Sequence, residues 1–227
     1  MQLPNAVRDR IRVTGFEPFI LALPSLRGRN DYQPLHALIE CWMDSTHTFH
    51  FHAASSLLTP SFAAIMGIAY AGDPVPFDRG LDIRSGDHIA YIRQLLGMVP
   101  PLKGTRTIKF DAILSHYTTA QVESMTSPAQ VDQVARAFLV YLLGSTLFPD
   151  MASSIDLMYL PPLQDLDLVS SYDWGSAALS YLYHGMDALV RGAKRMCGFW
   201  HAILVGFLHL ISFILYTLSI LTPISLS

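Results

Sequence analysis

The 227-residue sequence predicts a mainly α protein: a single compact helical domain with a small β-ribbon near residues 46–58 and an apolar C-terminal helix. Apolar residues recur at helical spacing along most of the chain, whereas "STHTFHF" (45–51) alternates as a strand does. Hydrophobic residues make up 51% of the chain and charged residues 15%, which is typical of a folded protein with a sizeable core. No repeat, low-complexity run or interdomain linker indicates a second domain.

The N-terminal half of the chain contains two predicted helices on either side of the ribbon. The first lies in "YQPLHALIECW" (32–42), where apolar residues at i, i+3, i+4 and i+7 place Trp42 on a buried face. The strand over 45–51 follows it. The next segment, "TPSFAAIMG" (59–67), begins with a capping Thr and a Pro and ends with Gly, as helices often do. The Gly- and Pro-rich stretch at 69–80 is expected to be a loop.

Two further helices are marked by their start signals. The segment "SGDHIAYIRQLLG" (85–97) has apolar residues at helical spacing after a serine that can cap it. The clearest signal begins at Ser127, the predicted N-cap, followed by Pro128 at the first helical position. Gln130 can close a capping box with that serine. This helix should end at Pro149, which cannot continue a helical hydrogen-bond ladder.

The last helix of the body is predicted over "WGSAALSYLYHGMDALV" (174–190), with Asp173 as its N-cap. Gly185 lies inside it and costs about 1 kcal/mol relative to Ala, so we expect it to permit the close approach of a neighbouring helix. Six large side chains on the predicted apolar faces should be buried: Trp42, Phe49, Phe138, Leu142, Trp174 and Leu182.

Charge and cysteine content exclude some classes of protein. The chain has 15 Lys and Arg against 18 Asp and Glu, so it lacks the basic excess that attracts nucleic-acid phosphates and gives no direct nucleic-acid signal. Cys41 and Cys197 are too few and too far apart for a disulfide scaffold. The composition therefore gives no support to nucleic-acid binding.

The histidines of "STHTFHFH" (45–52) raise the question of a metal site. On a strand, side chains alternate between two faces, so His50 and His52 share one face and His47 lies on the other. Zinc sites take at least three protein ligands, and the sequence offers no clear third one. Cys41 or Asp44 would have to be recruited by the fold. A structural strand is the better interpretation, and His50 and His52 are the only metal candidates.

No motif of catalysis or cofactor binding is found in the chain. The Gly-rich phosphate-binding loops, the dinucleotide fingerprint and the nucleophilic serine elbow are all missing from the sequence. "DRG" (78–80) and "GDH" (86–88) stand in the wrong order for a metallophosphatase. Lys103 and Lys109 are expected in a loop and at a helix start. The sequence therefore predicts no catalytic residue, no cofactor and no enzyme.

Several segments, in this order, resemble the plant mobile domain family. They are "LHALIECWMDSTHTFHF", "TPSFAAIMGIAYAGDPV", "ARAFLVYLLGSTLFPD" and the stretch from "LMYLPPLQDLDL" through "SYDWGSA". The resemblance covers residues 30–205. The family signature falls on Glu40, Trp42, Thr46, His47, Thr48, Phe49, His50, Pro149, Asp150, Asp165, Tyr172, Trp174 and Gly175.

The resemblance implies a function, and it carries no metal or catalytic role for the histidines. The family is also called aminotransferase-like, but no cofactor lysine can be located here. Members are related to transposon-encoded proteins, and the MAIN-like members are nuclear and linked to meristem maintenance, genome integrity and the silencing of transposable elements. Some carry the domain fused to a phosphatase of the phosphatase 7 long-form type. The resemblance thus implies a nuclear protein that acts through protein partners, with a phosphatase 7-like protein among the candidates.

The C-terminal segment departs from this pattern. No charged residue occurs from Met196 to Ser227, and residues 199–221 are long and apolar enough to cross a bilayer. Basic residues precede this stretch, as in membrane anchors, although a buried helix of the domain is equally compatible with the composition. Because the resemblance ends after Val205, we expect a domain over 1–205 and a tail over 206–227. That tail is expected to be foreign to the fold, either a membrane anchor or the mark of a truncated, mis-spliced copy.

Overall fold

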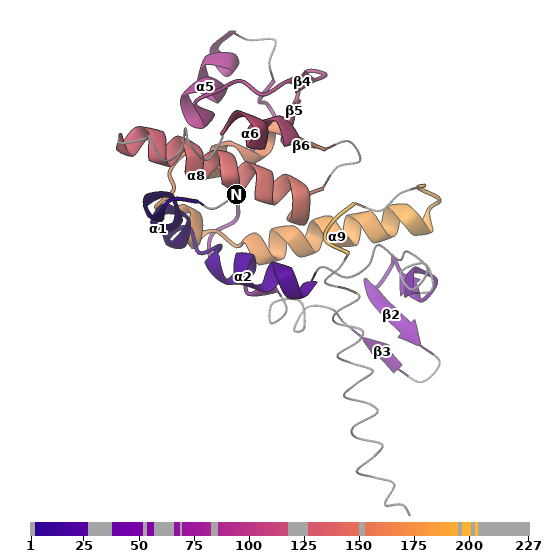
Figure 1. The fold of residues 1–227 in the computed structure, drawn as a ribbon. Helices are drawn as coiled ribbons and strands as arrows, with labels where there is room; N and C mark the ends of the chain where they lie inside the picture. The colour runs from indigo at the N-terminus through magenta and orange to yellow at the C-terminus, as the bar shows by residue number, and fades with distance from the viewer. Residues whose placement is uncertain are drawn as a thin grey trace, which may run out of the picture.

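The computed structural model describes residues 3–26, 38–51, 54–56, 66–68, 70–82, 86–117, 127–149, 153–194, 197–200 and 203. Figure 1 shows a mainly helical molecule with two small sheets. The helices are α1 (Asn5–Val13), α2 (Glu17–Leu26), α5 (Gly86–Leu96), α6 (Asp111–His116), α8 (Pro128–Leu142) and α9 (Trp174–Val190). The strands are β1 (Trp42–Met43), β2 (Thr48–Phe51), β3 (Ala54–Ser56), β4 (Leu102–Lys103), β5 (Thr107–Lys109) and β6 (Ser154–Asp156). Of the predicted helix over 59–67 only Met66 and Gly67 are described, and the capping Ser85 lies outside the described residues.

Two long helices, α8 and α9, organise the molecule. α1, α5 and α6 each pack against α8. Figure 1 shows α5, α6 and the β4–β6 strands on the side of α8 away from α9, and β2 and β3 beside the C-terminal half of α9. The core between these elements is apolar, and Leu139, Leu143, Leu147 and Ile155 are fully or almost fully buried in it. The two long helices therefore hold separate parts of the fold together.

The predicted start of α8 is confirmed in part. Ser127 has the extended backbone of an N-cap and Pro128 is the first helical residue, but the Ser127 side chain makes no capping hydrogen bond. At its other end the helix widens into a π-helical turn, Leu143–Leu147, before Pro149. A Cβ at Gly144 would lie 2.6 Å from the Phe110 ring, so this turn brings the helix backbone against α6. The proline ends the helix where it was expected to.

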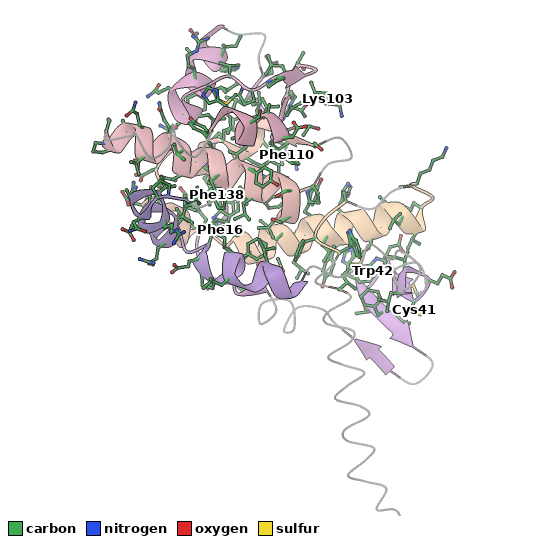
Figure 2. The ribbon with its side chains drawn as sticks, viewed as in Figure 1. Phe16, Cys41, Trp42, Lys103, Phe110 and Phe138 are labelled. Atoms are coloured by element: carbon green, nitrogen blue, oxygen red, sulfur yellow. The ribbon has the colours of Figure 1, made fainter. Side chains whose placement is uncertain are left out.

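The sheet formed by β4, β5 and β6 was not predicted. The three strands are antiparallel, and Ile108 of β5 pairs with Ile155 of β6 inside the core. Lys103 and Lys109, which were expected in a loop and at a helix start, instead end β4 and β5 (Figure 2). The expectation of one ribbon was therefore wrong, because a second sheet contributes its apolar face to the core.

The predicted ribbon is confirmed as a three-stranded antiparallel sheet, β1–β2–β3. Trp42 pairs with Phe49 across β1 and β2. Trp42 therefore lies on a strand, and its predicted place on a helical face is wrong. Residues 44–47 form the turn between these strands, and His47 has a positive φ of 52°.

The predicted buried side chains are confirmed with one exception. Trp42, Phe49, Leu142, Trp174 and Leu182 are buried, with exposed fractions of 0–5%. Phe138 is only partly buried and packs at the edge of the core, because the adjacent Ala137 and Leu139 occupy the inward face of α8.

The apolar segment after residue 197 enters the core before the described chain ends. Phe199, Trp200 and Ile203 are buried, and the Phe199 ring meets the Phe19 ring of α2 edge-on at 5.8 Å. Within the described residues, no helix has the length and apolar character needed to span a bilayer. The apolar C-terminal helix predicted beyond this point, including the tail over 206–227, lies outside the described residues.

Candidate functional site

The metal hypothesis can be tested on the geometry of the ribbon. Thr46, Thr48 and His50 do share one exposed face, where the two threonine hydroxyls lie 2.7 Å apart and the Thr48 hydroxyl lies 2.8 Å from His50 Nε2. The His50 imidazole is thus engaged by hydroxyl groups. His52, the second candidate, lies outside the described residues. No group of three or more His, Cys, Asp or Glu side chains suited to a metal ion occurs in the described parts of the chain.

The signature residues Trp42 and His47 converge on one carboxylate of α9. The Trp42 indole Nε1–H donates to Asp187 Oδ1 at 2.9 Å, and His47 Nε2 lies 3.2 Å from Asp187 Oδ2. The His47 ring also stacks on Tyr183 at 5.3 Å, and Trp42 packs between Tyr183 and Phe49. Figure 2 shows Trp42 directly beside α9. Trp42 of β1 and His47 of the β1–β2 turn therefore attach the sheet to α9.

A second, exposed contact reinforces the docking of the sheet. Arg191 Nη2, at the C-terminal end of α9, lies 3.1 Å from Asp44 Oδ2 in the β1–β2 turn. Exposed ion pairs of this kind contribute about 0–1 kcal/mol. The partly buried Asp187 cluster, in which only 14% of the aspartate side chain is exposed, is the stronger link between sheet and helix.

Several of the remaining signature residues also form structural contacts. Asp165 Oδ1 accepts a hydrogen bond from the Asp167 amide, and the Trp174 indole N–H donates to the Val169 carbonyl. Gly175 and Trp174 are buried at the start of α9. Pro149 supplies a carbonyl 3.5 Å from the Tyr181 hydroxyl. Glu40 is exposed just before β1, and Asp150 lies outside the described residues.

Two of the resembling segments, "GDPV" and "SYDWGSA", lie side by side. The Asp73 amide donates to the Ser171 carbonyl and the Asp173 amide donates to the Asp73 carbonyl, each at 2.8 Å. Gly72 has φ +139°, and a Cβ there would lie 2.1 Å from the Ser171 oxygen, so only glycine permits this approach. Tyr172 of the signature is the partner of Asp73 in this parallel bridge. Asp173 then caps α9 by accepting from the Ser176 amide at 2.9 Å, as predicted.

This pairing builds one wall of a cavity of about 870 Å³. Four aromatic rings line it: Phe77, Phe148, Tyr159 and Tyr181. Phe148 stacks on Tyr159 at 4.5 Å, Phe77 meets Tyr159 edge-on at 5.2 Å, and Tyr181 meets Phe148 at 5.4 Å. Its volume and aromatic walls are those of a small-molecule or side-chain binding pocket.

The polar residues of this cavity come from α9 and from the loop opposite. Ser176, Ser180 and His184 follow one another at i, i+4 and i+8 on α9, and Arg79 lines the cavity from the loop. Burial raises the pKa of the Tyr159 hydroxyl well above its ordinary value, so this group stays protonated at neutral pH. In the sequence, Arg79 belongs to the Asp-Arg-Gly triplet (78–80) that was rejected as a metallophosphatase motif.

The chemistry of the two sites differs. At the sheet, the polar side chains bind one another, and each oxygen of the Asp187 carboxylate has one partner, Trp42 or His47. Among the described residues that line the cavity, no hydrogen bond joins an acidic side chain to a basic one, as a general acid–base pair would require. The arrangement is suited to holding a ligand.

Comparison with known proteins places this geometry in a family context. The model of the Plant mobile domain matches residues 20–218. Protein MAIN-LIKE 1 of Arabidopsis thaliana is 28% identical over 172 residues, 72% of this chain and 33% of the relative. Protein MAINTENANCE OF MERISTEMS of the same plant is 31% identical over 168 residues, 72% of this chain and 34% of the relative. No solved structure matches the chain.

A phosphatase carries a similar region. The Arabidopsis thaliana serine/threonine-protein phosphatase 7 long form homolog is 30% identical over 181 residues, which cover 74% of this chain but 12% of that protein. This chain thus spans about a third or less of the length of these relatives. The family match begins within α2, includes α5 to α9 and runs past Val205, to residue 218, into the apolar segment.

Proposed function

Since the chain belongs to the plant mobile domain family, we propose that it is a non-enzymatic, transposon-related nuclear protein that acts through protein partners. The processes we propose for it are meristem maintenance, genome integrity and the silencing of transposable elements. The name of the relative MAINTENANCE OF MERISTEMS supports the first of these. The proposal concerns the domain, because each relative contains further sequence that this chain does not span.

One structural observation supports a binding protein over an enzyme. The signature residues that sequence analysis considered for chemistry, His47 and His50, are hydrogen-bonded within the fold, to Asp187 and to Thr48 respectively. The Trp42 indole completes the same contact with α9. These side chains stabilise the scaffold. The function of a domain built in this way depends on what its surfaces and cavity bind.

A phosphatase 7-like protein is a candidate partner. A region similar to this chain occurs within a chain named as a phosphatase 7 long form homolog, so the domain and a phosphatase coexist in one molecule there. We propose that a separate copy of the domain can associate with such a phosphatase, because domains that are fused in one protein often bind each other when they occur on separate chains.

Membrane attachment through residues 199–221 is a less well supported alternative. Phe199, Trp200 and Ile203, at the start of that stretch, are buried against the core. A spanning helix that began at residue 199 would withdraw these side chains from the core and expose its apolar surface. Localisation of a tagged full-length chain distinguishes the two: a nuclear signal supports the main proposal, and a membrane signal supports the alternative.

A domain exchange tests the proposed role directly. The region of MAINTENANCE OF MERISTEMS that matches this chain would be replaced by the chain, and the chimera expressed in plants that lack the original protein. We expect restored meristem maintenance and restored silencing of transposable elements. The Trp42→Ala chimera should fail, whereas Met43→Ala, at an exposed position of the same strand, should succeed.

The same material tests the enzymatic alternative. Stoichiometric zinc in the purified chain, or turnover of an amino donor with pyridoxal phosphate, would contradict the proposal. A chimera that accumulates normally and restores neither phenotype would also contradict it.

A further inference from the structure

The cavity beside the N-terminal half of α9 has features that the proposed function does not use. Its volume of about 870 Å³ falls within the roughly 300–1,000 Å³ that is typical of ligand pockets. Its walls come from four separate parts of the chain: the 72–79 loop, Phe148, the 158–159 segment and α9. Such pockets usually combine apolar walls with a few polar groups that orient the ligand.

The aromatic walls favour a flat, apolar body. The rings of Phe148 and Tyr159 stack on each other at 4.5 Å and are almost fully buried, so the ring surface available to a ligand comes mainly from the partly buried Phe77 and Tyr181. Aromatic ligands gain energy from stacked and edge-to-face contacts with such rings. Trp174 lies behind Phe77 and Phe148 and fixes them from the core side.

The polar groups of the cavity are mainly hydrogen-bond donors. The Arg79 guanidinium forms no ion pair or side-chain hydrogen bond with the described residues, and the same holds for His184 and the Ser180 hydroxyl. The neighbouring Asp78 forms no ion pair with Arg79 in the described structure, and its Oδ1 accepts a hydrogen bond from the Gly80 amide at 2.7 Å. An unpaired arginine beside aromatic rings is suited to a carboxylate or phosphate, which it can bind through two parallel hydrogen bonds.

One acidic side chain also lines the cavity and opposes an anion there. Asp173 Oδ1 is engaged as the cap of α9 and accepts from the Ser176 amide at 2.9 Å. Its charge is therefore partly balanced by the positive end of the helix, so the net preference of the lining is still set by Arg79.

We propose that this cavity binds an aromatic group that carries a carboxylate or phosphate, with the ring packed against Phe77 and Tyr181 and the anion on Arg79. The inference is independent of the proposed function, since it rests on the lining alone. The ligand has two sources of the same chemistry, a free small molecule or a phosphorylated tyrosine of a partner protein.

Phenyl phosphate, benzoate and neutral benzyl alcohol are suitable probes for the full chain, with binding followed by saturation-transfer NMR and Trp fluorescence. We expect phenyl phosphate to bind with a dissociation constant on the order of 1 mM or tighter, and benzyl alcohol to bind at least about tenfold more weakly. Arg79→Gln should lower the affinity for phenyl phosphate about tenfold and leave that for benzyl alcohol unchanged.

The matched control is Arg93→Gln, because Arg93 is an exposed arginine of α5 that does not line the cavity. It should bind phenyl phosphate as the unmodified chain does. Since Arg79 is exposed and forms no ion pair or side-chain hydrogen bond within the described part of the chain, its variant should keep the melting temperature of the unmodified chain. No transfer from phenyl phosphate to the protein, or equal affinity in the Arg79→Gln variant, would overturn the proposal.

Two further probes identify the source of the ligand. A phosphotyrosine peptide that binds at least tenfold more tightly than phenyl phosphate, and loses this affinity in the Arg79→Gln variant, indicates a partner protein. Adenosine monophosphate that binds more tightly than the peptide, with the same dependence on Arg79, indicates a free small molecule. If neither probe depends on Arg79, the anion does not bind where proposed.

Discussion

Removing the Asp187 carboxylate should weaken the fold more than its single charge suggests. Asp187→Ala deletes two hydrogen bonds, from the Trp42 indole at 2.9 Å and from His47 at 3.2 Å. A hydrogen bond to a charged acceptor contributes about 1.5–3 kcal/mol when it is sheltered, and Trp42 is 5% exposed. The His47 side chain is 47% exposed, so its share should be small. We therefore expect a loss of about 2–3 kcal/mol in the free energy of unfolding.

The assay is equilibrium unfolding in urea, followed by Trp fluorescence. Asp44→Ala is the control, because it removes the exposed ion pair with Arg191 that joins the same sheet to the same helix. That variant should lose about 0–1 kcal/mol. A double-mutant cycle between Asp187→Ala and Trp42→Phe should show a coupling of about 1–2 kcal/mol, since the two groups are in direct contact.

Hydrogen exchange locates the effect. The His50 amide of β2 donates to the Cys41 carbonyl at 2.7 Å, and this bond opens if the sheet leaves α9. We expect faster exchange at His50 in Asp187→Ala and little change in α8. If Asp187→Ala costs no more than Asp44→Ala, or if the exchange of His50 is unaltered, the cluster does not hold the sheet and the reasoning is refuted.

Three further outcomes follow from the same structure. Gly72→Ala should destabilise the fold by about 1–3 kcal/mol or more, because its Cβ would lie 2.1 Å from a carbonyl oxygen, whereas Gly86→Ala, with no atom within 4 Å, should be neutral in the same urea assay. Trp174→Ala should cost about 3–5 kcal/mol, and an unchanged melting temperature would disprove its place in the core. Hydrogen bonding to Arg10 lowers the pKa of Asp167 in the folded state. The pair therefore stabilises the fold at pH values above the unfolded-state pKa of about 3.9, and this stabilisation is lost as the pH falls through the lower folded-state pKa. Arg10→Gln should therefore differ less from the unmodified chain at pH 2 than at pH 6 in thermal unfolding.

The helices with local start signals could be predicted from the sequence. Pro128 follows a serine cap at the start of α8, and Asp173 caps α9 as expected, because these signals act within a few residues of the chain. Gly185 was expected to allow a close approach, and a Cβ there would lie 2.2 Å from the Cys197 carbonyl oxygen. The approaching segment is the chain that follows the helix, where another helix had been expected.

The second sheet could not be predicted in the same way. Its strands contain two or three residues each, which is too short for an alternating pattern to appear. The β5–β6 pair joins Ile108 to Ile155, which lie far apart in the chain on either side of α8. Trp42 was misplaced for a related reason. Its spacing fits a helix, but its indole N–H finds a carboxylate on α9 only when the residue lies on β1.

The residues of the candidate ligand site differ in how far the sequence identifies them. Phe77, Phe148 and Tyr159 each look like core residues in their own segments, and only the fold brings them together in the lining of one cavity. Arg79 is different, because an arginine among apolar residues needs an acidic partner or solvent. Asp78 is adjacent to it in the sequence, but in the structure Asp78 Oδ1 accepts from the Gly80 amide and no ion pair joins Asp78 to Arg79 among the described residues. In this Asp-Arg-Gly turn the Asp78 carboxylate binds the backbone, and the Arg79 guanidinium is therefore available to a ligand.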